Sequence, residues 1–319
     1  MGDRDTYLIQ RFAALNESGR LAHAYLLIGP TEVGKTRTAF GVAKVLNCEA
    51  SPGEGFCDQC PSCRKISNGN HPDIYFVTCK PGETIKIEQI REIIARLQLK
   101  AFEAKLKVCI IKNIENMTAE AANALLKTLE EPTPGTVFLL TSACPEIVLP
   151  TIRSRCQRFY LLGGSPQKLA DELKGDHALD ELRAHFLSHY AEGCLSRAKR
   201  LQKDKFFDRK NEIIDHILLR ADQGETYLKR NLLDKQRTKE ILQVLLSWFR
   251  DLLFMKVHCD TSRLVHLDRL AVLERFKGLY SFNEINGIVG GIVKAAGLLE
   301  ENLNIKIPLM LLKERLWRG

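Results

Sequence analysis

The feature that most constrains this chain is a glycine-rich loop between an apolar run and a helical pattern. The loop consists of Gly29, Pro30, Thr31, Glu32, Val33, Gly34, Lys35 and Thr36. It fits the pattern G-x-x-x-x-G-K-[ST], and the apolar run at residues 24–28 and the helical spacing at 35–46 give it a strand–loop–helix setting. That setting disfavours the alternative of a chance glycine turn.

The chemistry expected of this loop is phosphate binding. Its glycines let backbone N–H groups turn toward a polyphosphate, and the N-terminus of the following helix adds positive potential. We expect Lys35 to reach the β- and γ-phosphates of a nucleotide and Thr36 to ligate Mg²⁺. The sequence therefore predicts an ATP/Mg²⁺ site and leaves open whether it is used.

The first half of the chain alternates short apolar runs with helical patterns. Strands are predicted at residues 24–28, 74–77, 108–111, 137–141 and 158–162. Helices are predicted at residues 35–46, 87–99 and 118–129, the last with Thr118 as its N-cap. Strands that alternate with helices indicate an α/β fold with a parallel sheet covered on both faces.

The pattern changes at Gly163-Gly164-Ser165-Pro166, after which no strand pattern follows. The rest of the chain has amphipathic helical spacing, including residues 239–257 and 282–302. We predict three domains: an α/β domain at 1–163, a small helical domain at 164–205 and a larger helical domain at 206–319. The apolar helix faces beyond residue 206 are expected to drive assembly with partner chains.

The acidic residues that support nucleotide hydrolysis are missing from their expected place. Enzymes with such a loop hold Mg²⁺ with an acid at the end of a second apolar strand, often beside a second acid that activates water. The strand at 108–111 is followed by Lys112 and Asn113 instead. Loss of a general base costs about 10²–10⁴ in rate, so hydrolysis by the chain itself should be very slow. A bend could still bring Glu115 to the site.

Four of the ten cysteines lie within sixteen positions: Cys48, Cys57, Cys60 and Cys63. Their spacing, C-x8-C-x2-C-x2-C, is typical of a structural Zn²⁺ site, because four thiolates suit a closed tetrahedron. Pro52, Gly53, Gly55 and Pro61 make the connecting segment irregular. A redox pair is the alternative, and four clustered cysteines disfavour it.

The composition is that of a soluble globular chain. Hydrophobic residues make up 45% and charged residues 27%, and the formal net charge of +8 permits contact with nucleic acid without demanding it. We see no basic start followed by an apolar run, and no apolar stretch of membrane-spanning length. The expectation is a cytoplasmic protein with no membrane contact.

Three segments resemble the clamp-loader branch of the AAA+ ATPases. They are LAHAYL at 21–26 leading into the loop, AANALLKTLEEP at 121–132 and TIRSRC at 151–156. The four-cysteine insert at 48–63 strengthens the resemblance, and WFRDLL at 248–253 and Asn302-Leu303-Asn304 extend it weakly into the tail. The resemblance implies a P-loop AAA+ domain, a helical lid and an all-helical collar that joins subunits into a ring.

The resemblance also implies partners and a role for one arginine. Clamp loaders of this kind contain motor (gamma/tau) and delta subunits, and they place a sliding clamp on primer-template DNA. Ser154-Arg155-Cys156 resembles the family's trans-acting arginine motif, so Arg155 would reach the γ-phosphate held by a neighbouring subunit. The family's motor subunits resemble this chain, but they have acidic residues at the positions of Lys112 and Asn113 and an arginine at the position of Ser196. These three differences imply that this chain is a non-motor subunit.

Two alternatives remain open from the sequence. The chain could be an active ATPase motor subunit of the same complex. It could also be a zinc-containing DNA-binding module, since basic residues recur at Lys86, Arg91, Arg96, Lys100, Lys105 and Lys107. A solvated helix face explains these basic residues equally well.

Overall fold

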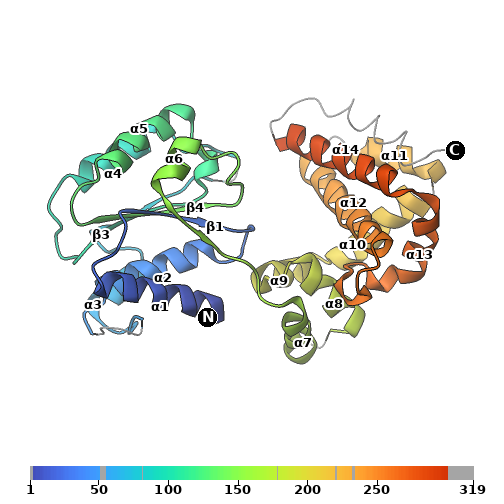
Figure 1. Ribbon diagram of the computed structural model, residues 1–319, viewed down its shortest axis with the longest axis horizontal. Helices are drawn as coiled ribbons and strands as arrows, with labels where there is room; N and C mark the ends of the chain where they lie inside the picture. The colour runs from blue at the N-terminus through green and yellow to red at the C-terminus, as the bar shows by residue number, and fades with distance from the viewer. Residues whose placement is uncertain are drawn as a thin grey trace. The chain divides into compact units, whose positions relative to one another are not determined.

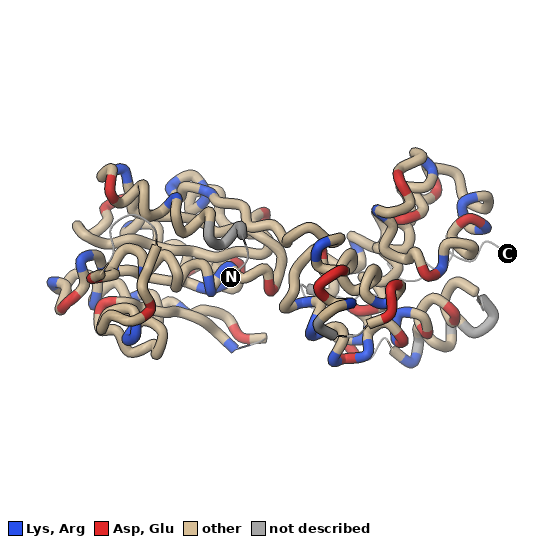
Figure 2. Tube along the Cα trace, turned by 90° about the horizontal axis from the view of Figure 1, so that it is seen from below, with Lys and Arg blue, Asp and Glu red and all other residues tan. Residues whose placement is uncertain are grey.

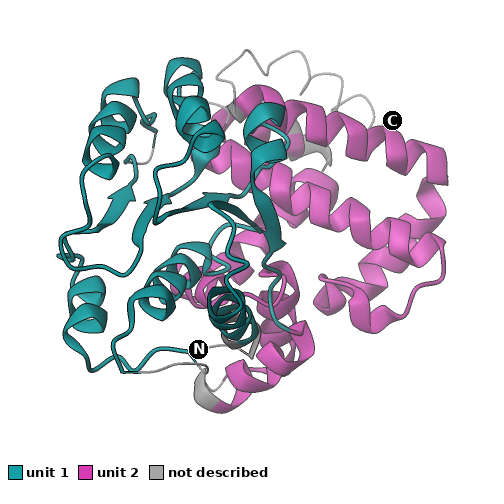
Figure 3. Cartoon of the chain, turned by 60° about the vertical axis from the view of Figure 1, so that its left-hand side comes forward, with its two compact units in different colours: residues 1–164 teal, residues 165–319 magenta. Residues whose placement is uncertain are grey.

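The computed structural model describes residues 3–50, 55–80, 82–177, 179–219, 221–231 and 234–300. The chain forms two compact units, residues 1–164 and residues 165–319 (Figure 3). The boundary lies in the Gly163–Pro166 stretch, where the sequence pattern changes from alternating strands and helices to helices.

A five-stranded parallel sheet forms the centre of unit 1 (Figure 1). Its strands are β1 (Ala24–Ile28), β2 (Ile74–Val77), β3 (Lys107–Ile111), β4 (Thr136–Ser142) and β5 (Gln157–Tyr160), in the order β2-β3-β4-β1-β5. All five strands predicted from the sequence are present, and their ends differ by at most two residues from the prediction. The predicted α/β class is confirmed.

Helices cover both faces of this sheet. They are α1 (Asp3–Glu17), α2 (Lys35–Asn47), α3 (Pro61–Ser67), α4 (Ile87–Leu97), the 3₁₀ turn η1 (Ile114–Asn116), α5 (Ala119–Glu130) and α6 (Pro150–Arg155). Figure 1 shows α1, α2 and α3 on one face and α4, α5 and α6 on the other. Helix α5 begins as predicted, because the hydroxyl of Thr118 accepts the Ala121 N–H at 3.2 Å.

Strand β1 shows how the apolar runs build two cores. Successive side chains of a strand point to opposite faces. Tyr25 and Leu27 therefore join the core beneath α1 and α2, whereas Leu26 and Ile28 join the core beneath α4 and α5. Every residue of β1 is buried, as expected for a parallel strand covered on both sides.

The order of the strands fixes where a ligand can bind. Strand β1 lies between β4 and β5, so the chain leaves β1 toward α2 at a point where the strand order changes direction. In open α/β sheets, ligands bind beyond the carboxyl ends of strands at such a point. The loop at residues 29–36 begins there.

Unit 2 is helical throughout its described residues. Its elements are α7 (Pro166–His177), α8 (Glu181–Tyr190), α9 (Leu195–Lys203), α10 (Phe206–Ile214), the π-helical turn η2 (Asp215–Leu219), α11 (Ala221–Asn231), α12 (Lys235–Lys256), the 3₁₀ turns η3 (Thr261–Arg263) and η4 (Leu267–Arg269), α13 (Leu270–Leu279) and α14 (Phe282–Glu300). In the part of the chain that the structure describes, no helix is long and apolar enough to cross a bilayer.

One hydrophobic core runs through the described helices of unit 2. It joins residues from both sides of the predicted boundary at 205: Phe186 of α8 stacks on Phe206 of α10, with 6.3 Å between ring centroids. The division of this unit into a lid and a collar stays a prediction. Asn302-Leu303-Asn304 and the rest of the tail beyond residue 300 lie outside the described residues.

Candidate nucleotide and metal sites

The glycine-rich loop lies between β1 and α2, at the carboxyl edge of the sheet. The Gly29 N–H donates to the carbonyl of Ser142 at 3.1 Å, which ties the loop to the end of β4. Gly34 begins α2 with φ of 99°, a left-handed conformation that glycine adopts without steric cost. A glycine therefore makes the turn from the loop into α2.

Gly29 is needed for close approach to the neighbouring strand. A Cβ atom at this position would lie 2.2 Å from the carbonyl oxygen of Leu161, which is backbone and cannot move aside. We expect Gly29→Ala to lower the free energy of unfolding by about 1–3 kcal/mol, the usual cost of overpacking. Denaturant unfolding followed by circular dichroism measures this.

Gly175→Ala is the matched control for that substitution. Gly175 lies in α7 with open space around its Cβ position, so alanine there should be neutral or stabilising. Equal stability of the two variants would contradict the steric argument for Gly29.

The ammonium group of Lys35 folds back onto the loop. Its side chain is buried, and Nζ donates to the carbonyls of Gly29 at 2.6 Å and Pro30 at 2.7 Å. A nucleotide would have to draw Lys35 from these carbonyls to its phosphates. Thr36 is half-buried in the first turn of α2.

The end of β3 has no carboxylate at either expected position. Lys112 is exposed, and Asn113 adopts a left-handed conformation with φ of 54° while its N–H donates to the hydroxyl of Thr141 at 3.0 Å. Thr141 is a buried polar residue at the end of β4 that the sequence pattern recorded only as part of a strand. Lys112 and Asn113 therefore leave the expected Mg²⁺ position without an acidic ligand at the end of β3.

Glu115 is brought back toward the sheet by the bend at Asn113. Its Oε1 accepts the Ala143 N–H at 2.9 Å, one residue beyond the Ser142 carbonyl that accepts from Gly29. Its Oε2 is buried without a hydrogen-bond partner among the described residues. The bend that the sequence left open therefore exists, and one Glu115 oxygen is used to cap the exit of β4.

Arg155 lies at the opposite edge of the sheet from the phosphate loop. It ends α6 just before β5, and Gln157 at the start of β5 pairs with Tyr25 of the parallel strand β1. Gly29 follows four residues after Tyr25, which separates the two levels by about 13 Å at 3.3 Å per residue. Arg155 is therefore poorly placed to serve the loop of its own chain.

The guanidinium of Arg155 has an internal partner that the sequence did not predict. Its Nη2 lies 2.5 Å from Oε1 of Glu130, and its Nη1 donates to the carbonyl of Thr151 at 3.0 Å. The only sequence signal for this partner was the Glu-Glu-Pro that ends the helix at 119–130. A third of the Arg155 side chain remains exposed, so the pair lies at the surface.

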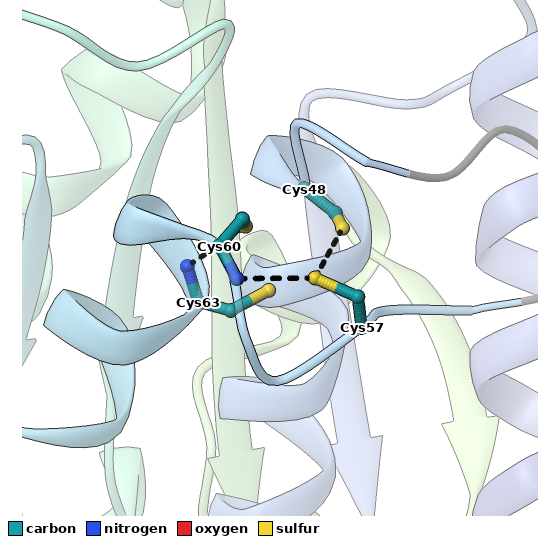
Figure 4. Close-up of side chains that lie close together, drawn as sticks. All are labelled: Cys48, Cys57, Cys60 and Cys63. Atoms are coloured by element: carbon teal, nitrogen blue, oxygen red, sulfur yellow. Dashed lines mark hydrogen bonds between the residues drawn. The ribbon is translucent and has the colours of Figure 1, made fainter.

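The four predicted metal ligands converge at one place (Figure 4). Their four Sγ atoms all lie within 4.8 Å of one another, and the atoms of Cys48 and Cys57 are 3.6 Å apart. A tetrahedral zinc site with Zn–S bonds of about 2.3 Å has sulfur atoms about 3.8 Å apart. The cluster could therefore hold a metal ion with little rearrangement.

Backbone N–H groups support the sulfur atoms of this cluster. Cys57 Sγ accepts from the N–H groups of Gln59 and Cys60, and Cys60 Sγ accepts from the Cys63 N–H, at 3.3–3.4 Å. Such bonds favour thiolates. Burial, followed by hydrogen bonding with Cys60, nevertheless raises the pKa of Cys63.

Three of the six basic residues behind the DNA-module alternative have partners within the chain, whereas Lys86, Arg91 and Lys100 are exposed. Lys107 is buried and donates to the carbonyls at the end of α4, Lys105 donates to the Cys48 carbonyl, and Arg96 pairs with Glu92. Figure 2 shows basic and acidic residues interspersed along both units. This arrangement weakens the case for a stand-alone DNA-binding module.

Comparison with known proteins agrees with the fold. A family model described as DNA polymerase III, delta subunit, matches residues 5–163, and a model of the C-terminal part of that subunit matches residues 204–317. The chain belongs to the clamp-loader family of DNA polymerase III subunits.

Individual relatives cover different shares of the chain. DNA polymerase III subunit delta' of Bacillus subtilis is 27% identical over 91% of this chain and 89% of its own length. The delta' subunit of Pseudomonas aeruginosa is 40% identical over 42% of each chain. DNA polymerase III subunit gamma of Buchnera aphidicola is 33% identical over 65% of this chain and 58% of its own. A solved gamma subunit-related protein of Thermotoga maritima is 19% identical over 98% of this chain and all of that chain, with a TM-score of 0.49.

Proposed function

We propose that this chain is the non-motor subunit of a DNA polymerase III clamp loader. It would assemble with motor (gamma/tau) and delta subunits into a complex that places a sliding clamp on primer-template DNA. The observation that carries the non-motor role is Lys112 and Asn113 at the end of β3, beside an otherwise intact phosphate loop. The delta' and gamma relatives support membership of the complex.

The chain's own chemistry is reduced to binding. The loop N–H groups and Lys35 could hold a nucleotide's phosphates, which would replace the Gly29 and Pro30 carbonyls as partners of Nζ. Neither Lys112 nor Asn113 can bind Mg²⁺ as a carboxylate does or accept a proton from water. A bound nucleotide would therefore stay unhydrolysed and have a structural role.

Arg155 would act on a neighbour's nucleotide. A planar guanidinium can bridge two oxygens of a transferring phosphoryl group and offset the charge that develops there. The placement of Arg155 at the amino edge of the sheet, away from its own loop, supports this role in trans. Glu130 would hold the side chain until a phosphate competes for it.

The four-cysteine site would hold Zn²⁺ in a structural role. Four thiolates close the coordination sphere, so no position remains for a substrate or a reactive water. The site joins the end of α2 to α3, which brings Ile66 of α3 into the core beneath α2. Zinc would thus fix a short helix that has little core of its own.

The direct test of the non-motor role is to measure ATP hydrolysis by the isolated chain, which should be nearly absent. We expect turnover well below about 1 s⁻¹, a typical lower value for enzymes. Lys112→Asp combined with Asn113→Glu should raise the rate, because it restores the metal ligand and the general base. Steady-state phosphate release measures both, and motor-like turnover of the unmodified chain would refute the non-motor assignment.

An active motor subunit is the second candidate, favoured by one observation. Glu115 lies beside the peptide that anchors Gly29, with one carboxylate oxygen unpaired among the described residues. If Glu115 supports hydrolysis, Glu115→Gln should abolish the measured rate. On the non-motor proposal it leaves a negligible rate unchanged.

A further inference from the structure

A cavity in unit 2 gathers charged groups that neither proposed site uses. Its volume is about 430 Å³, within the usual range for small-molecule sites. Four separate segments of the chain line it: the start of α7, the end of α8, α12 and η3. The lining residues are Ser165, Pro166, Gln167, His189, Glu192, Arg250, Ser262 and Arg263.

Arg250 is held in place at this cavity. Its Nη2 donates to Oδ1 of Asp251 at 3.1 Å and to the carbonyl of Arg263 at 3.4 Å, and its guanidinium lies over the ring of Phe254 at 5.1 Å. Its Nη1 donates to none of the described residues. A guanidinium fixed in this way loses little side-chain entropy on binding an anion.

Both carboxylate oxygens of Asp251 already accept hydrogen bonds, so Asp251 is not available to pair with a cation other than Arg250. The Oδ2 atom of Asp251 accepts the N–H groups of Val265 and His266 at 2.8 Å each, and the side chain is fully buried. The carboxylate is therefore committed to Arg250 and to the backbone before α13.

Arg263 adds a second guanidinium to the same cavity. Its side chain makes no hydrogen bond or ion pair with the residues that the structure describes, and it is exposed. Glu192 is the one carboxylate among the lining residues, and it already faces Nη1 of Arg197 at 3.8 Å. Arg250 is already paired with Asp251, so Arg263 is the cavity guanidinium that has no ion-pair partner among the described residues, and an anion would offset its charge.

The N-terminus of α7 faces the cavity from a third direction. Pro166 begins this twelve-residue helix and has no N–H, and the Leu169 N–H donates to the Ser165 carbonyl at 3.1 Å. The N–H groups of Gln167 and Lys168 remain, because the first turn of a helix offers them no partner within the helix. Their positive potential favours an anion in addition to the two guanidiniums.

We propose that this cavity binds a phosphate group through Arg250, Arg263 and the first turn of α7. Guanidinium groups suit phosphate because each can present two N–H donors to two oxygens. The cavity is larger than one phosphate ion, so it has room for an attached organic group. The phosphate could come from free inorganic phosphate or from a nucleotide, and the test separates these sources.

His189 offers a reporter within the cavity. Burial, then the charge of the adjacent His185, lowers the pKa of His189, and the positive charge of Arg250 lowers it further. His185 and His189 are stacked with ring centroids 3.9 Å apart. Phosphate beside the ring would add negative charge and raise the pKa of His189.

The experiment titrates the full chain with inorganic phosphate, AMP and adenosine at constant ionic strength. The imidazole signal of His189 is followed by nuclear magnetic resonance, since the loop at 29–36 also suits phosphate and total binding would mix the two sites. We expect saturable shifts with phosphate or AMP and a higher pKa of His189, and no shift with adenosine. Tighter binding of AMP than of phosphate would identify a nucleotide as the source, and the reverse would identify the free ion.

Two variants decide whether the arginines hold the ligand. Arg263→Gln should weaken binding about tenfold, the value of one lost charge-assisted hydrogen bond. Lys203→Gln removes one positive charge from an exposed residue of α9 outside the cavity and should bind as the unmodified chain does. The proposal is overturned if phosphate and AMP leave His189 unchanged, if chloride or adenosine shifts it equally, or if the two variants bind alike.

Discussion

Arg155→Ala should lower ATP hydrolysis and clamp loading by the assembled complex while this chain stays folded. An arginine that reaches a transferring phosphoryl group from a neighbouring subunit contributes about 10³–10⁵ in rate at the site it faces. Only that site would lose the arginine, so the bulk rate of a complex with several motor sites should fall in part. Steady-state hydrolysis and clamp loading, measured with unmodified motor subunits, test this.

Two further variants sharpen the test of Arg155. Arg155→Lys should rescue poorly, because an ammonium cannot present a planar pair of donors to two phosphate oxygens. Arg158→Ala is the matched control: Arg158 is an exposed arginine of β5, three residues away. Unchanged rates with Arg155→Ala in a complex shown to be assembled would remove Arg155 from the mechanism.

The folding cost of Arg155→Ala should be small. The ion pair with Glu130 is partly exposed at both partners, and such pairs contribute about 0–1 kcal/mol. A large activity loss combined with unchanged stability would therefore come from the lost contact with the neighbour's phosphate.

Cys60→Ser should reduce bound zinc from one ion per chain to none. Three remaining thiolates leave the tetrahedron open, and structural zinc in small peptides binds with about 10–16 kcal/mol of apparent free energy at pH 7. We expect α3 to lose hydrogen-exchange protection while the sheet survives, because the strands are buried by cores on both faces. Metal analysis and hydrogen exchange measure the two effects.

Cys144→Ser provides the control for the metal experiment. Cys144 is exposed and lies outside the cluster, so its replacement should leave the zinc content unchanged. Purification without chelator that yields no zinc in the unmodified chain would rule out the metal site.

Local sequence was sufficient for the sheet and for the phosphate loop. The apolar runs of β1, β3 and β4 are buried on both faces, as strands in a covered parallel sheet require. Gly34 at φ of 99° and the cap at Thr118 are likewise local devices that the residue types announce. The C-x-x-C spacings brought Cys57, Cys60 and Cys63 together for the same reason, since a short turn joins them.

Contacts between distant segments were decided only by the tertiary structure. The ion pair of Arg155 with Glu130 joins residues 25 positions apart, and the bond from Ala143 to Glu115 joins residues 28 apart. Neither leaves a periodic signal, because each depends on how two helices or strand ends meet. The cavity in unit 2 has the same origin: Ser165, His189, Arg250 and Arg263 belong to separate helices and turns, and only their packing around one core brings them together.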